Sequence, residues 1–162
     1  MAAYPASSEV QAYLHRHIPL SAAMGVRVLT CDADGAVVSA PLAPNINHRS
    51  TVFGGSASAV AILAAWTWLH FWLRAADRAS RLVIQKNTVD YLAPITGAFE
   101  ARCVPPDRAS VEKFLHTLGR HGRARLELSV GLTCGDGKVA TFVGDYVAIA
   151  LTNNTGTNAG PG

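Results

Sequence analysis

Polar residues and a glycine pair precede a long apolar segment in the stretch NINHRSTVFGGS, from Asn45 to Ser56. If a helix begins near Gly54, its first N–H groups have no partner within the helix and carry the positive end of the helix dipole. Glycine has no side chain to keep a ligand carbonyl away from this backbone. The stretch therefore predicts an oxyanion hole at the backbone N–H of Gly55 or Ser56. Close packing of a helix on a strand is the alternative use of the two glycines.

A histidine and two asparagines belong to the same stretch. His48 could orient water or donate to the ligand oxygen, because an imidazole gains or loses a proton near neutral pH. Asn45 and Asn47 could position the ligand, or they could hold the loop through hydrogen bonds to its backbone. The predicted catalytic residues are His48, Asn47, Gly55 and Ser56, and the predicted substrate contacts in this stretch are Asn45, Thr51, Phe53 and Gly54.

Other kinds of site have less support in the sequence. Ser56 and Ser58 lie in GGSAS, which lacks the final glycine of the GxSxG nucleophile elbow. His15 and His17 are two residues apart and so do not share a helical face, and neither HExxH nor paired cysteines occur. No metal and no cofactor are expected. Asp90 could act as a base, although a solvent-facing charge is the simpler interpretation.

The segment from Gly54 to Leu73 contains no formal charge and is long enough to cross a bilayer, which takes about 20 apolar residues. Its first half consists largely of Gly, Ser and Ala, however, and Trp66, Trp68 and His70 interrupt its second half. A helix that is apolar on all sides can equally form the core of a soluble assembly. We favour this buried helix, without a membrane span.

The rest of the chain predicts an α+β architecture. Val10, Leu14 and Ile18 recur at intervals of four in a short helix that Pro19 ends. The stretch RARLELSVGLT alternates apolar and polar residues, as a half-buried strand does. The expected order is a helix (7–18), a hairpin around Asp34-Gly35, the apolar helix (54–73), two strands (81–91 and 98–104), a short helix (107–120) and two strands (123–133 and 138–150). Paired strands with segregated helices indicate an antiparallel sheet.

Three regions follow from this order: an N-terminal helical segment (1–20), the main domain (21–151) and a tail (152–162) that has too little to bury and is expected to be disordered. On the strand that starts at Arg81, unbroken alternation would place Gln85, Asn87, Val89 and Tyr91 on one face. Asn87 is a predicted substrate contact on that face.

The composition limits the remaining function classes. Only 15% of the residues are charged, against about 25% in average domains, and 49% are hydrophobic. Much surface must therefore be buried, as in a homo-oligomer. The net charge of +3 comes from scattered basic residues, which argues against a nucleic-acid partner. Cys31, Cys103 and Cys134 form no CxxC pair, and the N-terminal stretch lacks a signal-peptide core, so a cytoplasmic location is expected.

These features together resemble the hotdog fold of acyl-thioester enzymes, an antiparallel sheet wrapped around a long central apolar helix. The segments that carry the resemblance are PNINHRSTVFGGS (44–56), VDYLAPITGAFEARC (89–103) and GDGKVATFVGDYV (135–147). Over residues 21–150 the chain is similar to the putative thioesterase family that forms the C-terminal domain of the bacterial YiiD acetyltransferase-like proteins. The resemblance implies hydrolysis of an acyl thioester of coenzyme A or acyl carrier protein, and a homodimer with acyl sites between its subunits. Arg120 and Arg123 would then meet the phosphates of the carrier.

The chain departs from that family pattern in one respect. Characterised hotdog thioesterases usually carry an Asp or Glu on the central helix, about two turns in, whereas this chain has neither residue anywhere from Gly35 to Ala76. A thioesterase that works without this carboxylate is the leading hypothesis. The alternatives are a dehydratase, isomerase or cyclase that acts on a related acyl chain, and a non-catalytic acyl-binding domain.

Overall fold

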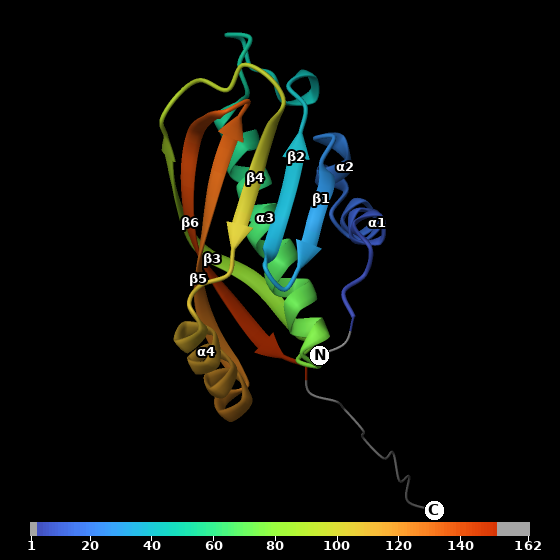
Figure 1. Cartoon of the computed structure of the whole chain (residues 1–162), viewed down its shortest axis with the longest axis vertical. Helices are drawn as coiled ribbons and strands as arrows, with labels where there is room; N and C mark the ends of the chain where they lie inside the picture. Colours follow the sequence, from blue (N-terminus) through green and yellow to red (C-terminus); the bar gives the residue numbers. More distant parts are fainter. Residues whose placement is uncertain (1–2, 152–162) are drawn as a thin grey trace, which may run out of the picture.

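Six antiparallel strands form one sheet in the order β1-β2-β4-β5-β6-β3, and the sheet curves around a single long helix (Figure 1). The computed structural model describes residues 3–151, so the predicted tail lies outside the described residues. The strands are β1 (Arg27–Asp32), β2 (Gly35–Ala40), β3 (Ser80–Tyr91), β4 (Phe99–Val104), β5 (Arg123–Cys134) and β6 (Gly137–Ala150). The helices are α1 (Ser7–His17), α2 (Pro19–Ala23), the 3-10 turn η1 (Ala43–Asn45), α3 (Gly54–Ala75) and α4 (Arg108–His121). The predicted α+β architecture and its order of elements are confirmed.

Helix α3 is the core around which the sheet packs. Twelve of its 22 residues are buried: Ala57, Val60, Ala61, Leu63, Ala64, Ala65, Thr67, Trp68, Leu69, Phe71, Leu73 and Ala75. The hydroxyl of Tyr146 on β6 crosses to the helix and donates to the carbonyl oxygen of Ile62 at 2.9 Å. By length and composition alone α3 could cross a membrane, but 61% of the most apolar 18-residue stretch of this helix is buried inside the fold. It is therefore the buried central helix that the sequence favoured.

Strand β5 shows the predicted alternation. Leu126, Leu128 and Val130 are buried toward the core, while Arg125 and Glu127 are exposed on the outer face. One face of a half-buried strand packs on the helix and the other meets solvent. The alternation of apolar and polar residues in the sequence thus reflects the burial of every second side chain.

Strand β3 differs from the prediction at Gln85, where a β-bulge shifts the register against β6 between Ile84 and Lys86. A bulge adds one residue to one strand and so exchanges the faces of everything beyond it. Leu82, before the bulge, and Val89, after it, therefore both pack toward the core. Asn87, Val89 and Tyr91 share a face as predicted, but Gln85 occupies the bulge, which unbroken alternation cannot reveal.

Helix α1 joins the same core by burying Val10 and Leu14. It ends at His17, and Pro19 then occupies the first position of α2, where its missing N–H costs nothing. The prediction that Pro19 stops the first helix is confirmed. The short second helix was not predicted, because five residues leave no readable periodicity.

Aromatic rings fill the contact between α1 and α3. The His70 ring stacks on Trp66, with 4.4 Å between the ring centroids, and lies 5.1 Å from the ring of Tyr13. The Nε2 atom of His70 is buried and has no hydrogen-bond partner among residues 3–151. Burial, reinforced by the positive charges of Arg74 and His17, lowers the pKa of His70 to about 4.

We expect His70 to make the fold less stable in mild acid. In the unfolded chain this imidazole takes up its proton near pH 6.5, whereas in the fold it does so near pH 4, so protonation favours unfolding between these values. As the pH is lowered across this window, the free energy of unfolding should decrease by at most about 1.4 kcal/mol per pH unit. Solvent screening makes the actual decrease smaller. Urea denaturation of the wild type and His70→Phe from pH 8 to 4 tests this. The variant keeps the ring stack, and parallel stability curves for the two proteins would contradict the prediction.

Candidate active site

Asn45 holds the loop before α3 in place through hydrogen bonds, and this residue is only 2% exposed. Its Nδ2 donates to the carbonyl oxygens of Met24 and Pro41, each at 2.8 Å, and its main-chain carbonyl oxygen accepts the N–H of Phe53 at 2.8 Å. The side-chain amide therefore ties η1 to the end of α2, and the main-chain carbonyl ties it to Phe53, the N-cap residue of α3. Asn45 therefore holds the loop in place, and its role as a substrate contact stays a prediction.

Asn47 closes the turn that carries His48. Its Oδ1 accepts the N–H of Arg49 at 2.8 Å, and its Nδ2 donates to Thr51 Oγ1 at 3.0 Å. The backbone N–H of Asn47 also donates to the carbonyl oxygen of Thr51 at 2.8 Å. The side chains of Asn47 and Thr51 are thus both used in hydrogen bonds within the turn, and His48 in this turn is exposed to solvent. Within the described part of the chain no hydrogen bond holds the His48 ring.

The start of α3 leaves two backbone donors free. Phe53 is the N-cap residue, and its carbonyl oxygen accepts the N–H groups of Ser56 at 2.9 Å and Ala57 at 3.1 Å. The N–H groups of Gly54 and Gly55 donate to nothing in residues 3–151. Of the two predicted donors, Ser56 is therefore already used, and Gly55 remains available together with Gly54.

A surface hollow of about 390 Å³ adjoins Gly54, the first of these two donors. Its lining comes from the loop, from the first turn of α3 and from the segment after β3: Thr51, Val52, Gly54, Ala57, Tyr91, Leu92, Ala93, Pro94 and Ile95. Four large apolar side chains around the helix start are more than one-third exposed: Ile46, Phe53, Tyr91 and Leu92. The site combines free N–H donors with apolar surface, which suits a ligand that has a polar carbonyl and a hydrocarbon chain.

Tyr91 is the residue of this site that the sequence did not single out. Its hydroxyl donates to the carbonyl oxygen of Gly54 at 2.8 Å and so connects the last residue of β3 to the first residue of α3. In the sequence Tyr91 stood at the end of a predicted strand, within the VDYLAPITGAFEARC segment that carries the family resemblance. Its contact with a residue 37 positions away depends on the tertiary structure.

Asp90, Cys31 and Cys103 are poor candidates for a base or a nucleophile at the helix start. Asp90 pairs in register with Thr141, on the face of β3 opposite to Tyr91, and is exposed there. Burial raises the pKa of the Cys31 and Cys103 thiols to about 12, which keeps both protonated at neutral pH.

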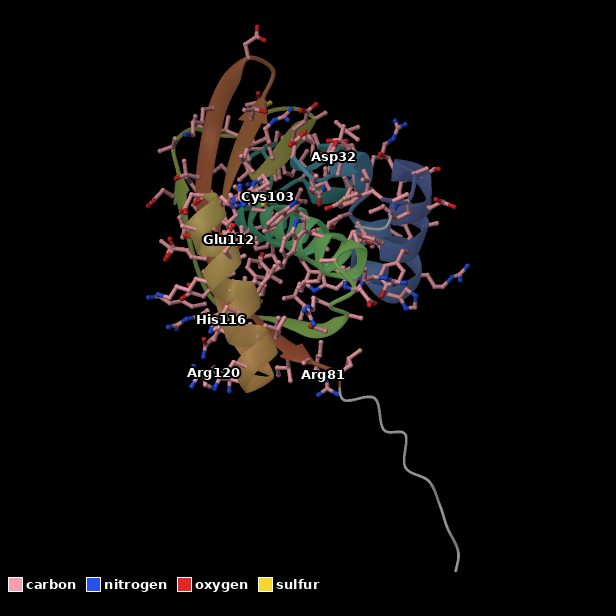
Figure 2. The ribbon with its side chains drawn as sticks, turned by 60° about the horizontal axis from the view of Figure 1, so that its bottom comes forward. Asp32, Arg81, Cys103, Glu112, His116 and Arg120 are labelled. Atoms are coloured by element: carbon pink, nitrogen blue, oxygen red, sulfur yellow. The ribbon has the colours of Figure 1, made fainter. Side chains whose placement is uncertain are left out.

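The structure separates the remaining predicted contacts from the helix start within one protomer. Gly119 and Gly122 line a hollow with residues 77–80, which follow the C-terminal end of α3, so Arg120 and Arg123 lie at that end. Figure 2 shows Arg120 and His116 on α4, at the same end of the molecule as Arg81. A helix of 22 residues is about 33 Å long, which keeps both arginines far from Gly55 of the same chain. Asn87 lies four residues from Tyr91, about 13 Å along β3.

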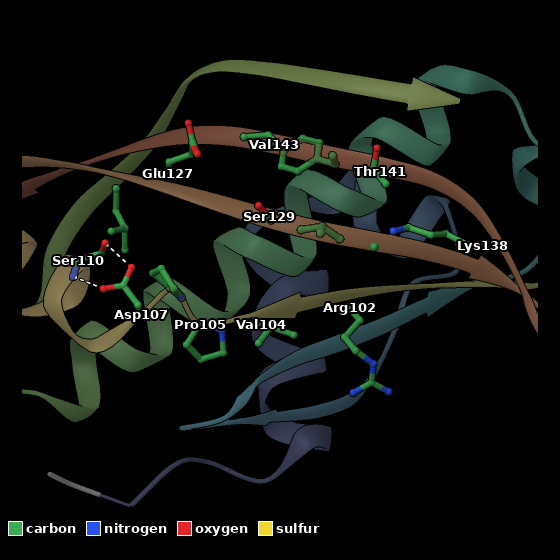
Figure 3. Close-up of a pocket in the computed structure, with 15 residues that line it drawn as sticks. Arg102, Val104, Pro105, Asp107, Ser110, Glu127, Ser129, Lys138, Thr141 and Val143 are labelled. Carbon is green, nitrogen blue, oxygen red and sulfur yellow. Dashed lines mark hydrogen bonds between the residues drawn. The ribbon is translucent and has the colours of Figure 1, made fainter. Parts of the chain in front are cut away.

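A larger hollow, of about 620 Å³, lies elsewhere, on the outer face of the sheet near the start of α4 (Figure 3). Arg102, Ser129, Lys138 and Thr141 line it, together with Asp107, which caps α4 by accepting the N–H of Ser110 at 2.9 Å. None of the predicted site residues borders this hollow. Hollow size alone therefore does not identify the candidate site.

Comparisons with known proteins agree with this architecture. A family model described as "Putative thioesterase (yiiD_Cterm)" matches residues 7–150. A crystal structure of the putative thioesterase from Shewanella oneidensis is 31% identical, with a TM-score of 0.79, and the match covers 88% of this chain and 96% of that one. A protein with unknown function from Chlorobaculum tepidum is 27% identical, with a TM-score of 0.84 and coverage of 90% and 94%.

A thioesterase from Haemophilus influenzae shares the fold at 10% identity, with a TM-score of 0.74 and coverage of 94% of this chain and 96% of that one. At this identity the likeness concerns the arrangement of sheet and central helix alone.

Proposed function

The chain belongs to this putative thioesterase family, with the hotdog fold, and from that premise we propose that it hydrolyses an acyl thioester to a free acid and a thiol. The observation that carries the proposal is the pair of free N–H groups at Gly54 and Gly55, at the positive end of a 22-residue helix whose first residue, Gly54, lines a surface hollow. A thioester carbonyl bound there would have its oxygen at the donors and its acyl chain on apolar surface.

In the proposed reaction, water adds to the carbonyl carbon of the thioester. The Gly55 N–H, assisted by that of Gly54, stabilises the negative charge that develops on the carbonyl oxygen. His48 orients the attacking water and takes its proton. The C–S bond then breaks, and the leaving thiolate receives a proton to become the free thiol. No carboxylate on α3 takes part in these steps.

A second copy of the chain is part of the proposal. Strand β3 has 12 residues and forms an edge of the sheet, with Val83 44% exposed on it. Such a long edge favours pairing with another strand. If two β3 strands pair antiparallel, the start of one lies beside the end of the other. Arg120 and Arg123 would then approach Gly55 of the other copy, where they could meet the phosphates of coenzyme A or of a carrier protein in the cytoplasm.

The absence of acidic side chains from Gly35 to Ala76 favours a second candidate function, a non-catalytic acyl-binding domain. Such a domain would use the same helix start and the same apolar surface, without turnover. A non-hydrolytic enzyme for a related acyl chain would turn over but leave the thioester intact.

We expect the purified protein to release thiol from at least one member of a panel of acyl-coenzyme A thioesters of varied chain length. His48→Ala should lower kcat by about 100-fold or more, because general base assistance typically contributes that much. His116→Ala is the matched control: it removes an exposed histidine from α4, and kcat should stay at the wild-type value. Tight binding of acyl-coenzyme A in calorimetry without thiol release would overturn hydrolysis and favour the binding domain. Equal kcat values for both variants and the wild type would remove His48 from the mechanism.

A further inference from the structure

Two tyrosine hydroxyls donate to main-chain carbonyls of α3, one at its first residue and one farther along. Tyr91, the last residue of β3, donates to Gly54 O at 2.8 Å, and Tyr146 on β6 donates to Ile62 O at 2.9 Å. The second hydroxyl belongs to a side chain that is fully buried in the core, whereas Tyr91 is 54% exposed. An exposed hydrogen bond contributes little to global stability, because water can replace it.

The Gly54 carbonyl belongs to the same peptide group as the Gly55 N–H. A peptide group is planar and trans, so its C=O and N–H point in opposite directions and turn together. The hydroxyl that holds the Gly54 oxygen therefore also fixes the direction of the Gly55 N–H, which donates to nothing in the described structure.

Glycine on both sides of this peptide makes the hydroxyl more important. Glycine restricts its backbone dihedrals less than any other residue, and the first turn of a helix has few internal hydrogen bonds. A Cβ atom at Gly54 would lie 3.4 Å from both Cζ and Oη of Tyr91, so the tyrosine ring packs directly on this backbone. Tyr91 thereby restrains the Gly54–Gly55 peptide, which the two glycines themselves leave free to turn.

The same bond strengthens the Gly55 N–H as a donor. One lone pair of the Gly54 carbonyl serves the hydrogen bond along the helix, and the other is free for the Tyr91 hydroxyl. Hydrogen bonds to a carbonyl polarise its peptide group and strengthen the donor at the other end. The polarised Gly55 N–H is the group to which a substrate oxygen would bind in the proposed site.

We propose that Tyr91 is a positioning residue for thioester hydrolysis, whose hydroxyl orients and polarises the Gly54–Gly55 peptide so that the Gly55 N–H binds the developing oxyanion. The inference rests on the proposed function, because it assigns Tyr91 to the same site. Tyr91 acts only through this peptide and does not itself contact the reacting atoms.

Tyr91→Phe removes the hydroxyl and keeps the ring. We expect kcat for acyl-coenzyme A hydrolysis to fall about tenfold, KM to stay within about twofold, and the melting temperature to change by less than about 2 °C. Tyr146→Phe is the matched control, since it removes the other hydroxyl bonded to α3. It should lower the melting temperature and leave kcat unchanged.

A double-mutant cycle with Gly55→Pro decides whether Tyr91 acts through this peptide. Proline at position 55 has no N–H, so Tyr91→Phe should cause no further loss of kcat in that background. A tenfold loss in both backgrounds, or a loss that appears in KM alone, would overturn the proposal.

The Gly55 amide resonance gives a readout that needs no turnover. In Tyr91→Phe the Gly55 amide proton should move upfield by more than that of Ala57, and an unchanged Gly55 resonance would overturn the positioning role. If the wild type released no thiol from any thioester while the Gly55 resonance moved as expected, the proposed function would fail and the orientation of the peptide by Tyr91 would stand.

Discussion

Gly55→Pro should lower kcat for acyl-thioester hydrolysis by about 100- to 1000-fold, the usual loss when one oxyanion donor is removed. The substitution removes the N–H of residue 55, which has no acceptor in residues 3–151. The fixed φ of proline suits the first turn of a helix, and Gly54 before it has no Cβ to clash with the proline ring. The fold should therefore persist, which circular dichroism and thermal melting can check beside the steady-state kinetics.

Gly55→Ala is the matched control for this change. A Cβ atom at position 55 clashes with the ring of Phe53 in either variant, and this exposed ring can swing into solvent. The alanine variant suffers that clash but keeps its N–H. If the proline and alanine variants lost the same factor in kcat, the Gly55 N–H would not be the oxyanion donor.

Phe142→Ala should lower the free energy of unfolding by about 3 to 5 kcal/mol, because it removes a large buried ring and leaves a cavity. Phe142 is 1% exposed on β6, and its ring lies so close to Gly144 that a Cβ atom there would come within 2.7 Å of it. The packing around this ring leaves little room for compensating movement. Urea denaturation measures the loss, and the melting temperature should fall by about 6 to 20 °C.

Val143→Ala provides the contrast on the same strand. Val143 is 40% exposed on the outer face, and its truncation should cost less than about 1 kcal/mol. Neighbouring residues of a strand point to opposite faces, so a register shifted by one residue would exchange the two results. Equal losses for both variants would contradict the observed register of β6.

Several parts of the fold follow from sequence periodicity. The period of two in β5 and the long uncharged run of α3 each record a burial pattern, and burial is the largest local signal that a sequence carries. The glycine pair at Gly54 and Gly55 likewise marked the start of the helix, because free N–H groups and close approach are properties of the local backbone. These features needed no knowledge of distant residues.

Other features depended on contacts between segments that are far apart in the chain. Asn45 and Asn47 have the same chemistry, yet one is buried against Met24 and Pro41 while the other closes an exposed turn. The bulge at Gln85 lets both Leu82 and Val89 pack toward the core. Such outcomes depend on which partner reaches each side chain, and residue type does not specify the partner.

Residue types and spacing thus determined the α+β order, the buried central helix and the loop in which we propose the site. The tertiary structure alone decided that Tyr91 meets Gly54 across 37 residues and that Arg120 lies at the opposite end of α3. The physical reason is the range of the interactions. Periodicity and helix polarity act over a few residues, whereas hydrogen bonds between elements form only after the sheet has closed around the helix.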